Sequence, residues 1–229
     1  MPVNANQTLK TLSDVLLFMS SFAGGAVPDS TDQEYIDWVR WIGMKQEEYA
    51  LRAFWRRCLT RATITLNGET TVLPDRFHKH NGIYILEVDG VDWAEPINSD
   101  GQSIFVEMDG DPLSANFGKW QVRFLNAPVN VSATLWYFAN PPRPTVSTDI
   151  LIMPGDMVGY AALAEYFRTT GAEGSQDKAE EDAENRFSEY LSLEMIPPKY
   201  ELLSFKNPDR VDRTSMYRGF YSRTGRNRQ

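Results

Sequence analysis

Ser175 and Lys178 have the spacing that brings a serine nucleophile and a lysine base together in penicillin-interacting enzymes. The Lys-Thr-Gly segment that completes that machinery does not occur in the sequence, and acidic residues follow Ser175 closely. We expect a helix to begin near Ser175, because serine favours the N-terminal cap. The pattern therefore predicts a helix cap rather than a catalytic pair.

The two histidines of the chain, His78 and His80, could together bind a metal ion at a strand edge. With Lys79 between them and no third histidine, a solvated loop is favoured, and a metal shared between subunits of an oligomer stays an open alternative. Asp109-Gly110-Asp111 resembles the start of a calcium loop but lacks the other EF-hand ligands. We expect a turn there, because aspartate binds its own backbone in turns.

Carboxylates and tryptophans are frequent in the middle of the sequence. Two carboxylates facing each other across a cleft could cleave a glycosidic bond, and Trp93, Trp120 and Trp136 could stack on sugars. A carbohydrate-binding or carboxylate-based hydrolytic module is therefore the alternative function. Most of the acids stand at expected turns, which favours a structural role. They are Asp75, Glu87, Asp89, Asp92, Glu95, Asp100, Glu107, Asp109 and Asp111.

Other features also argue against an enzyme. Neither a glycine-rich phosphate loop nor a nucleophile elbow occurs in the sequence. Cys58 is the single cysteine, which excludes a disulfide framework within one chain, and its helix-like surroundings predict a buried structural thiol. We expect no catalytic residue, no metal and no cofactor.

The apolar run of residues 15–19, followed by small residues 23–26, superficially resembles a secretory signal. Asp14 abuts this run, which favours an amphipathic helix. No apolar run approaches the roughly 20 residues that span a bilayer. We therefore expect a chain without a membrane partner, made in the cytoplasm.

Apolar residues at helical spacing predict four helices. The first carries Leu9 to Met19 and ends at Gly24-Gly25. The second begins at Ser30 or Thr31 and closes at Arg56-Arg57. The third is capped by Asp156 and stops at Gly171, and the fourth runs from near Ser175 to Pro197-Pro198, which forbids continuation.

Between these helix pairs the apolar pattern alternates every second residue, which predicts short strands. Asn67-Gly68 predicts a tight hairpin between 62–66 and 70–73, because both turn residues tolerate positive φ. The other expected strands are 83–88, 103–108, 120–125 and 131–138.

The order of elements predicts an α+β fold. Residues 1–58 and 150–196 would form a four-helix body, because each helix has one apolar stripe to bury. Residues 59–149 would form an inserted antiparallel β-sandwich or barrel-like domain with its own core. Residues 197–229 would form an extended C-terminal tail.

This tail differs in charge from the rest of the chain. It carries eight basic residues and three acids, a balance of +5, whereas the whole chain carries −8 and the preceding residues therefore −13. Arginine and aromatic residues bind nucleic acid in some proteins and anchor protein interfaces in others. Asp209, Asp212 and the acidic body favour an arm that docks on a protein. The expected anchors are Tyr200, Phe205, Arg210, Arg213, Tyr217, Arg218, Phe220, Tyr221, Arg223 and Arg226.

Four segments carry a resemblance to a known family. They are Leu73-Pro74-Asp75-Arg76-Phe77, the stretch from Trp136 to Pro142, Met157 to Glu165, and Phe187-Ser188-Glu189-Tyr190-Leu191. In this order, over roughly residues 30 to 196, the chain resembles the head-to-tail adaptor (connector or neck) proteins of tailed, especially short-tailed, bacteriophages. The large β insertion and the long Arg-rich tail depart from the family pattern.

The resemblance implies a structural virion protein at the head–tail junction rather than an enzyme. Such adaptors form a homo-oligomeric ring, usually twelve-fold, beneath the portal, and their C-terminal arm binds the portal. Tail or nozzle proteins bind the other end, and DNA passes through the lumen during ejection. An acidic channel repels phosphate, so DNA would slide without specific binding. Glu180, Glu181 and Glu184 are the expected channel-facing acids.

Overall fold

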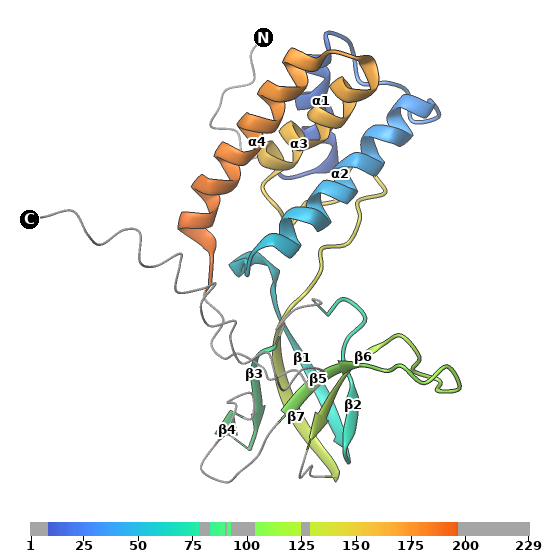
Figure 1. The fold of residues 1–229 in the computed structure, drawn as a ribbon, viewed down its shortest axis with the longest axis vertical. Helices are drawn as coiled ribbons and strands as arrows, with labels where there is room; N and C mark the ends of the chain where they lie inside the picture. Colours follow the sequence, from blue (N-terminus) through green and yellow to red (C-terminus); the bar gives the residue numbers. More distant parts are fainter. Residues whose placement is uncertain (1–8, 78–82, 90, 93–103, 125–128, 197–229) are drawn as a thin grey trace, which may run out of the picture.

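The structure is a computed structural model that describes residues 9–77, 83–89, 91–92, 104–124 and 129–196 of the 229-residue chain. The helices gather at one end of an elongated molecule and the strands at the other (Figure 1). Two helices precede the strands in the sequence and two follow them. The expected α+β class, with a β insertion in a helical body, is confirmed for the described residues; the tail of residues 197–229 lies outside them.

The first helix, α1 (Leu12–Ala23), begins at a reciprocal cap. The Asp14 N–H donates to the Thr11 hydroxyl at 3.2 Å, and the Thr11 N–H donates to the Asp14 carboxylate at 2.9 Å. This Thr11 N–H, above all, lowers the pKa of Asp14. Gly24 ends the helix with φ +80°, so the predicted end is confirmed.

The second helix, α2 (Gln33–Arg52), begins slightly later than predicted and ends four residues before Arg56. The chain is already extended at Ala53, and Arg56–Cys58 form a short 3-10 turn, η1. The cause is Trp55, which is fully buried and whose indole N–H donates to the Tyr49 carbonyl at 2.8 Å. Burying this ring requires the chain to leave the helix, so the predicted closure at Arg56-Arg57 is wrong.

The last two helices, α3 (Gly155–Thr170) and α4 (Glu173–Glu194), form a hairpin. The turn at Gly171 has φ +75°, as its sequence predicts. The N-cap of α3 is Pro154 and α4 begins at Glu173, so neither Asp156 nor Ser175 is the capping residue expected.

The strands form two antiparallel sheets. The four-stranded sheet has the order β1, β7, β3, β4, and the three-stranded sheet has the order β2, β6, β5. The long strands β1 and β7 pair from Leu59↔Phe138 to Asn67↔Val129. The bounds are β1 (Leu59–Asn67), β2 (Thr70–Val72), β3 (Ile83–Val88), β4 (Val91–Asp92), β5 (Ile104–Met108), β6 (Trp120–Phe124) and β7 (Val129–Phe138).

The predicted hairpin at Asn67-Gly68 is wrong in its pairing. Gly68 does turn with φ +82°, but Asn67 keeps a negative φ. The two strands then separate, because β1 pairs with β7 and β2 with β6. The turn therefore carries the chain from one sheet to the other, and pairing with partners distant in the sequence overrides the local hairpin signal.

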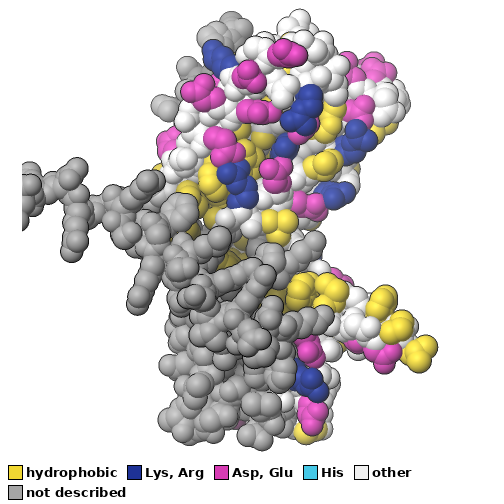
Figure 2. Space-filling view, in the orientation of Figure 1, with side chains coloured by type: hydrophobic (Ala, Val, Ile, Leu, Met, Phe, Trp, Pro, Cys, Tyr) yellow, Lys and Arg dark blue, Asp and Glu magenta, His cyan; other side chains and the backbone are white. Residues whose placement is uncertain are grey.

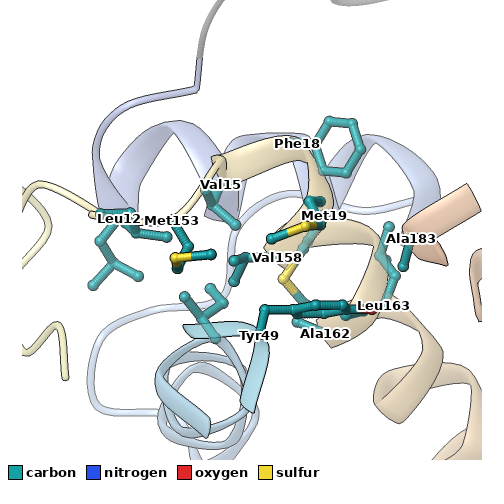
Figure 3. Close-up of a cluster of buried hydrophobic side chains, with 14 of the residues drawn as sticks. Leu12, Val15, Phe18, Met19, Tyr49, Met153, Val158, Ala162, Leu163 and Ala183 are labelled. Atoms are coloured by element: carbon teal, nitrogen blue, oxygen red, sulfur yellow. The ribbon is translucent and has the colours of Figure 1, made fainter. Parts of the chain in front are cut away.

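Two hydrophobic clusters lie on either side of a narrow junction. In the helical cluster, Val15 and Met19 of α1 lie near Val158 and Leu163 of α3, with Tyr49 of α2 beside them (Figure 3). The β cluster contains Leu66, Phe77, Leu86, Val122 and Leu135. The two clusters meet at Phe138 of β7, which packs in the helical cluster against Phe54 and Tyr84, with ring centroids 4.9 and 6.0 Å away.

Gly159 of α3 allows α1 to pack closely on that helix. A methyl group at this position would lie 2.8 Å from the Phe18 ring. None of the helices, as far as the structure describes them, is long and apolar enough to cross a membrane.

One polar side chain is buried between α2 and the segment that returns from the strands. Gln46 is 1% exposed. Its amide nitrogen donates to the Pro142 carbonyl at 2.8 Å, and its oxygen accepts the N–H groups of Ile152 and Met153 at 2.9 and 3.3 Å. A single side chain thus fixes both ends of the connection between β7 and α3.

Replacing Gln46 by the similarly sized methionine is expected to destabilise the fold by about 1–3 kcal/mol, because the buried Met153 N–H and the half-buried Ile152 N–H lose their acceptor and the Pro142 carbonyl loses its donor. Gln33→Met, at the exposed start of α2, is the matched control and should change stability by less than about 0.5 kcal/mol. Urea denaturation of both variants measures the difference. Equal unfolding free energies would contradict the assigned role of Gln46.

Candidate functional site

All the predicted docking anchors of the arm, Tyr200 to Arg226, lie outside the described residues, so the structure places only the root of the arm. Met195 forms an antiparallel bridge with Trp55, and the Ile196 N–H donates to the Phe54 carbonyl at 2.8 Å. The end of α4 is thereby joined to the segment between α2 and β1. Ile196, the last described residue, therefore lies at the junction between the helical body and the strands.

Arg57 holds three chain segments together beside this root. Its guanidinium forms two hydrogen bonds with the Glu194 carboxylate at the end of α4 and donates to the Ile152 carbonyl at 3.0 Å. A planar guanidinium suits such two-pronged binding of a carboxylate. From its sequence, Arg57 was expected only to close a helix; its position beside the junction comes from the early end of α2.

Tyr190 links the last turns of α4 to the start of α3. Its hydroxyl donates to the Asp156 carboxylate at 3.1 Å, and Arg186 approaches the same carboxylate at 3.4 Å. Burial, followed by the charge of Asp156, raises the pKa of Tyr190 to about 12. The phenol therefore stays protonated and donating, and Asp156 is a tertiary contact rather than a helix cap.

The three predicted channel-facing acids of α4 differ in their surroundings. Glu184 binds the Arg52 guanidinium through both oxygens, and Glu180 pairs with Arg168 at 3.3 Å. These bonds lower the pKa of Glu184, for which the Arg52 hydrogen bond is the main cause, and that of Glu180, for which Gln176 contributes most. Glu181 is exposed. Two of the three charges are thus balanced by neighbouring helices, and the channel-facing role stays a prediction.

Among the described carboxylates of the β part, Glu107 of β5 accepts from the Gln121 amide of β6 at 3.3 Å and lies 3.9 Å from Arg123, whereas Asp109 serves a turn. Asp109 accepts the Ser114 hydroxyl at 2.6 Å and the Asp111 N–H at 3.0 Å, so its two oxygens organise a loop. Both carboxylate oxygens of Asp109 are therefore hydrogen-bonded within the loop, as expected for an aspartate in a turn. No group of three potential metal-ligating side chains occurs within the described part of the chain. His78 and His80 lie outside it.

The described tryptophans of the strands do not share one surface. Trp120 of the three-stranded sheet packs towards Phe77 in the β cluster, at 6.3 Å between ring centroids. Trp136, on β7 of the other sheet, lies beneath the Arg61 guanidinium at 5.8 Å. Trp93 lies outside the described residues. The alternative carbohydrate-binding function gains no stacking platform from the described pair.

The remaining reactive side chains have structural surroundings. Cys58 is buried with its sulfur 3.9 Å from that of Met153, and burial raises its pKa to about 12, so the thiol is protonated. This confirms the predicted buried thiol. Ser175 is exposed in the first turn of α4, as is Lys178 one turn later.

Comparison of the sequence with models of known protein families and with curated proteins gives no match.

Arg57→Ala should free the root of the arm. Loss of its bonds to Glu194 and Ile152 is expected to cost about 1–2 kcal/mol and to speed amide exchange of Ile196, because the bridge beside it loosens. Its exposed neighbour gives the matched control, Arg56→Ala, which should leave that exchange unchanged. Hydrogen exchange read by NMR or mass spectrometry is the measurement; equal exchange in both variants would refute the role of Arg57.

The Arg52–Glu184 pair should make the free energy of unfolding depend on pH in the acidic range. Because the pKa of Glu184 is lowered on folding, its contribution is present above the ordinary value of 4.5 and is lost as the pH falls through the lowered value. The pair is partly exposed, so Glu184→Gln should cost only about 0.5 kcal/mol at neutral pH. In urea unfolding at two pH values, one neutral and one below the lowered pKa of Glu184, this cost should be lost at the lower value, because the protonated carboxyl is then neutral, as glutamine is.

Glu181→Gln, three residues away on the same helix, serves as the control for this pair. Its effect should be the same at both pH values. A Glu184→Gln cost that persists undiminished in acid would show that the pair does not carry the effect.

Proposed function

We propose that this chain is a structural virion protein, a ring-forming adaptor that joins the portal of a phage head to the tail. The helical bodies would pack side by side around a DNA channel, the strands would face outward or towards the tail, and residues 197–229 would dock on the portal. Tail or nozzle proteins would bind the opposite end. The sequence resemblance and the position of the arm root support the proposal.

The root of the arm is the single observation that carries most weight. An arm that must transmit a pull from the portal needs an anchor to the whole subunit and not to one helix end. Met195 and Ile196 pair with the segment between α2 and β1, and Arg57 fastens Glu194 to the same place. Force on the arm would therefore reach both the helical body and the strands.

The helical body has the rigidity that a ring subunit needs. Lys45 of α2 pairs with Glu165 of α3 at 2.9 Å, and Arg168 of α3 connects that glutamate to Glu180 of α4. The Arg52 guanidinium lies 4.1 Å from the Phe187 ring centroid and also binds Glu184. Paired charges thus cross-link three helices around a core of close-packed side chains.

The outer surface of the helices offers apolar contacts to a neighbour. Ile36, Met44 and Leu51 of α2 are exposed, and their spacings of eight and seven residues put them near one face of the helix. The same helix carries the ion pairs Arg40–Asp37 and Lys45–Glu48. Over the helical end as a whole, hydrophobic and charged side chains are intermixed (Figure 2). Such mixed surfaces suit subunits that fold first and assemble later.

The charge of the arm supports docking on a partner protein. Its balance of +5 opposes the −13 of the rest of the chain, so the arm is attracted to acidic surfaces. The arm is also rich in arginine and aromatic residues, the types that most often anchor protein interfaces.

The test is a portal pull-down with the full chain and with a variant carrying Arg213→Ser, Arg218→Ser and Arg223→Ser. The portal is the one encoded in the same genome. We expect the variant to fold as the parent does and to lose at least about tenfold in affinity, because interface arginines and aromatics carry most binding energy. The control replaces Arg40 and Arg56 of the helical body and Arg123 of β6, all outside the arm, by serine. Equal binding of the arm variant and the parent would refute the docking role.

A further inference from the structure

The two halves of α4 are held to the rest of the helical body in different ways. Every residue of α4 is described, and its two buried side chains, Ala179 and Ala183, both lie in the first half, where they belong to the helical cluster. From residue 184 to residue 194, each side chain is exposed or half-buried. Close packing therefore fixes the first half more firmly than the second, which reaches down to the junction with the strands (Figure 1).

Arg52, the last residue of α2, holds the second half of α4 through two kinds of contact at once. Its guanidinium donates to both carboxylate oxygens of Glu184 and lies 4.1 Å from the centroid of the Phe187 ring. The centroid of the Tyr49 ring is also close, at 4.9 Å from the same guanidinium. A planar guanidinium can stack on aromatic rings while its edge binds a carboxylate. One charged side chain therefore joins the end of α2 to the middle of α4.

Arg57 of η1 repeats this arrangement at the end of α4. Its guanidinium donates to both carboxylate oxygens of Glu194 and lies 6.0 Å from the centroid of the Tyr190 ring. The two arginines, Arg52 and Arg57, are called the arginine clasp below. Their partners on α4 are Glu184, Phe187, Tyr190 and Glu194.

The charges of the arginine clasp are accessible to ions in solution. In its two ion pairs the side chains are between 23% and 51% exposed, and the pair between Arg186 and Asp156 of α3 is exposed to a similar degree. Salt weakens such pairs, because the screening length falls from about 10 Å at 0.1 M to about 3 Å at 1 M. One partly exposed pair contributes little, but these pairs all act on the same half of one helix. The attachment of this half therefore depends on ionic strength.

Aromatic packing sets a limit to this dependence. The rings of Phe187 and Tyr190 pack against the helical cluster, and salt does not screen these contacts. The Phe187 ring centroid lies 5.5 Å from that of Tyr49 and 5.7 Å from that of Trp55. Salt should thus shift an equilibrium between attached and detached forms rather than remove the attachment.

We infer that the arginine clasp is a salt-sensitive conformational device that lets residues 184–196 separate from the helical body while residues 173–183 stay packed. The separating segment includes Met195, which forms a bridge with Trp55, and Ile196, whose N–H donates to the Phe54 carbonyl. Opening of the clasp therefore also frees the point at which the arm begins. Ionic strength sets the fraction of chains in which the arm root is released. The inference concerns a single chain and does not rest on the proposed function.

Amide hydrogen exchange of the full chain, read by mass spectrometry at about 0.05 M and about 1 M sodium chloride, tests the device. After correction for intrinsic exchange rates, we expect the amides of 187–196 to exchange at least about threefold faster at the higher concentration, because the exposed ion pairs are screened. The amides of 176–183 are the internal reference and should keep their rate. Equal rates of 187–196 at both concentrations would overturn the inference. An equal acceleration in both halves would also overturn it, because the whole helical body would then be loosening.

The double variant Arg52→Gln, Arg57→Gln removes the arginine clasp. Exchange of 187–196 should already be fast at low salt, and its response to sodium chloride should be smaller than in the parent. The matched control is Arg40→Gln, Arg56→Gln, which removes the same charge from α2 and η1 outside the clasp and should keep the parent's response. An undiminished response in the clasp variant would overturn the inference. If the clasp variant does not fold, the exchange of the parent decides.

These outcomes are separate from those of the portal pull-down. An α4 helix that does not respond to salt would overturn the device and leave the adaptor function standing. A salt-released arm root in a chain that does not bind the portal would do the reverse.

Discussion

Three hydrogen bonds to the buried amide of Gln46 fix the path by which the chain returns from the strands to the helices. The connection between β7 and α3 is long; Leu151 and Met153 near its end are buried in the helical cluster, and the bonds of Gln46 act together with this apolar packing. Because Gln46 lies on α2, the bonds also set the position of α2 relative to the start of α3. The remaining packing of the helical body follows from that placement.

The same junction carries other contacts that join the helical body to the strands. Trp55 is buried just after the end of α2, where its indole N–H binds the Tyr49 carbonyl. Arg57 joins η1 to the end of α4, and Phe138 packs the end of β7 into the helical cluster. The arm begins where these contacts meet. In the proposed adaptor, this arrangement would connect the portal-binding arm to both the helical body and the strands.

The sequence predicted the elements well where local chemistry decides them. Gly24 and Gly171 end helices because they adopt positive φ, and Ile83–Val88 is predicted with its observed bounds from its alternating apolar pattern. Prediction from the sequence failed where contacts with residues distant in the sequence decide the structure. The turn at Gly68 is real, but β1 and β2 join different sheets, and Trp55 ends α2 early by burying itself against the end of α4.

The candidate site was predictable only in outline. The charge change at Pro197 is visible in the sequence, whereas the anchoring of the arm root depends on Arg57 and Glu194, residues 137 positions apart that ordinary patterns do not connect. The loop of residues 109–119 had a weak signal, since Leu113 and Phe117 are large apolar residues within a stretch rich in turn formers. Only the bonds of Asp109 show that this stretch is ordered while its apolar side chains remain exposed.

Electron cryo-microscopy of the full chain mixed with the portal from the same genome tests the central claim most directly. The account predicts a ring of this chain beneath the portal, with density for residues 197–229 running from the junction beside Ile196 onto the portal surface. A chain that stays monomeric in the presence of the portal, or a complex in which residues 197–229 make no contact with it, would contradict the account.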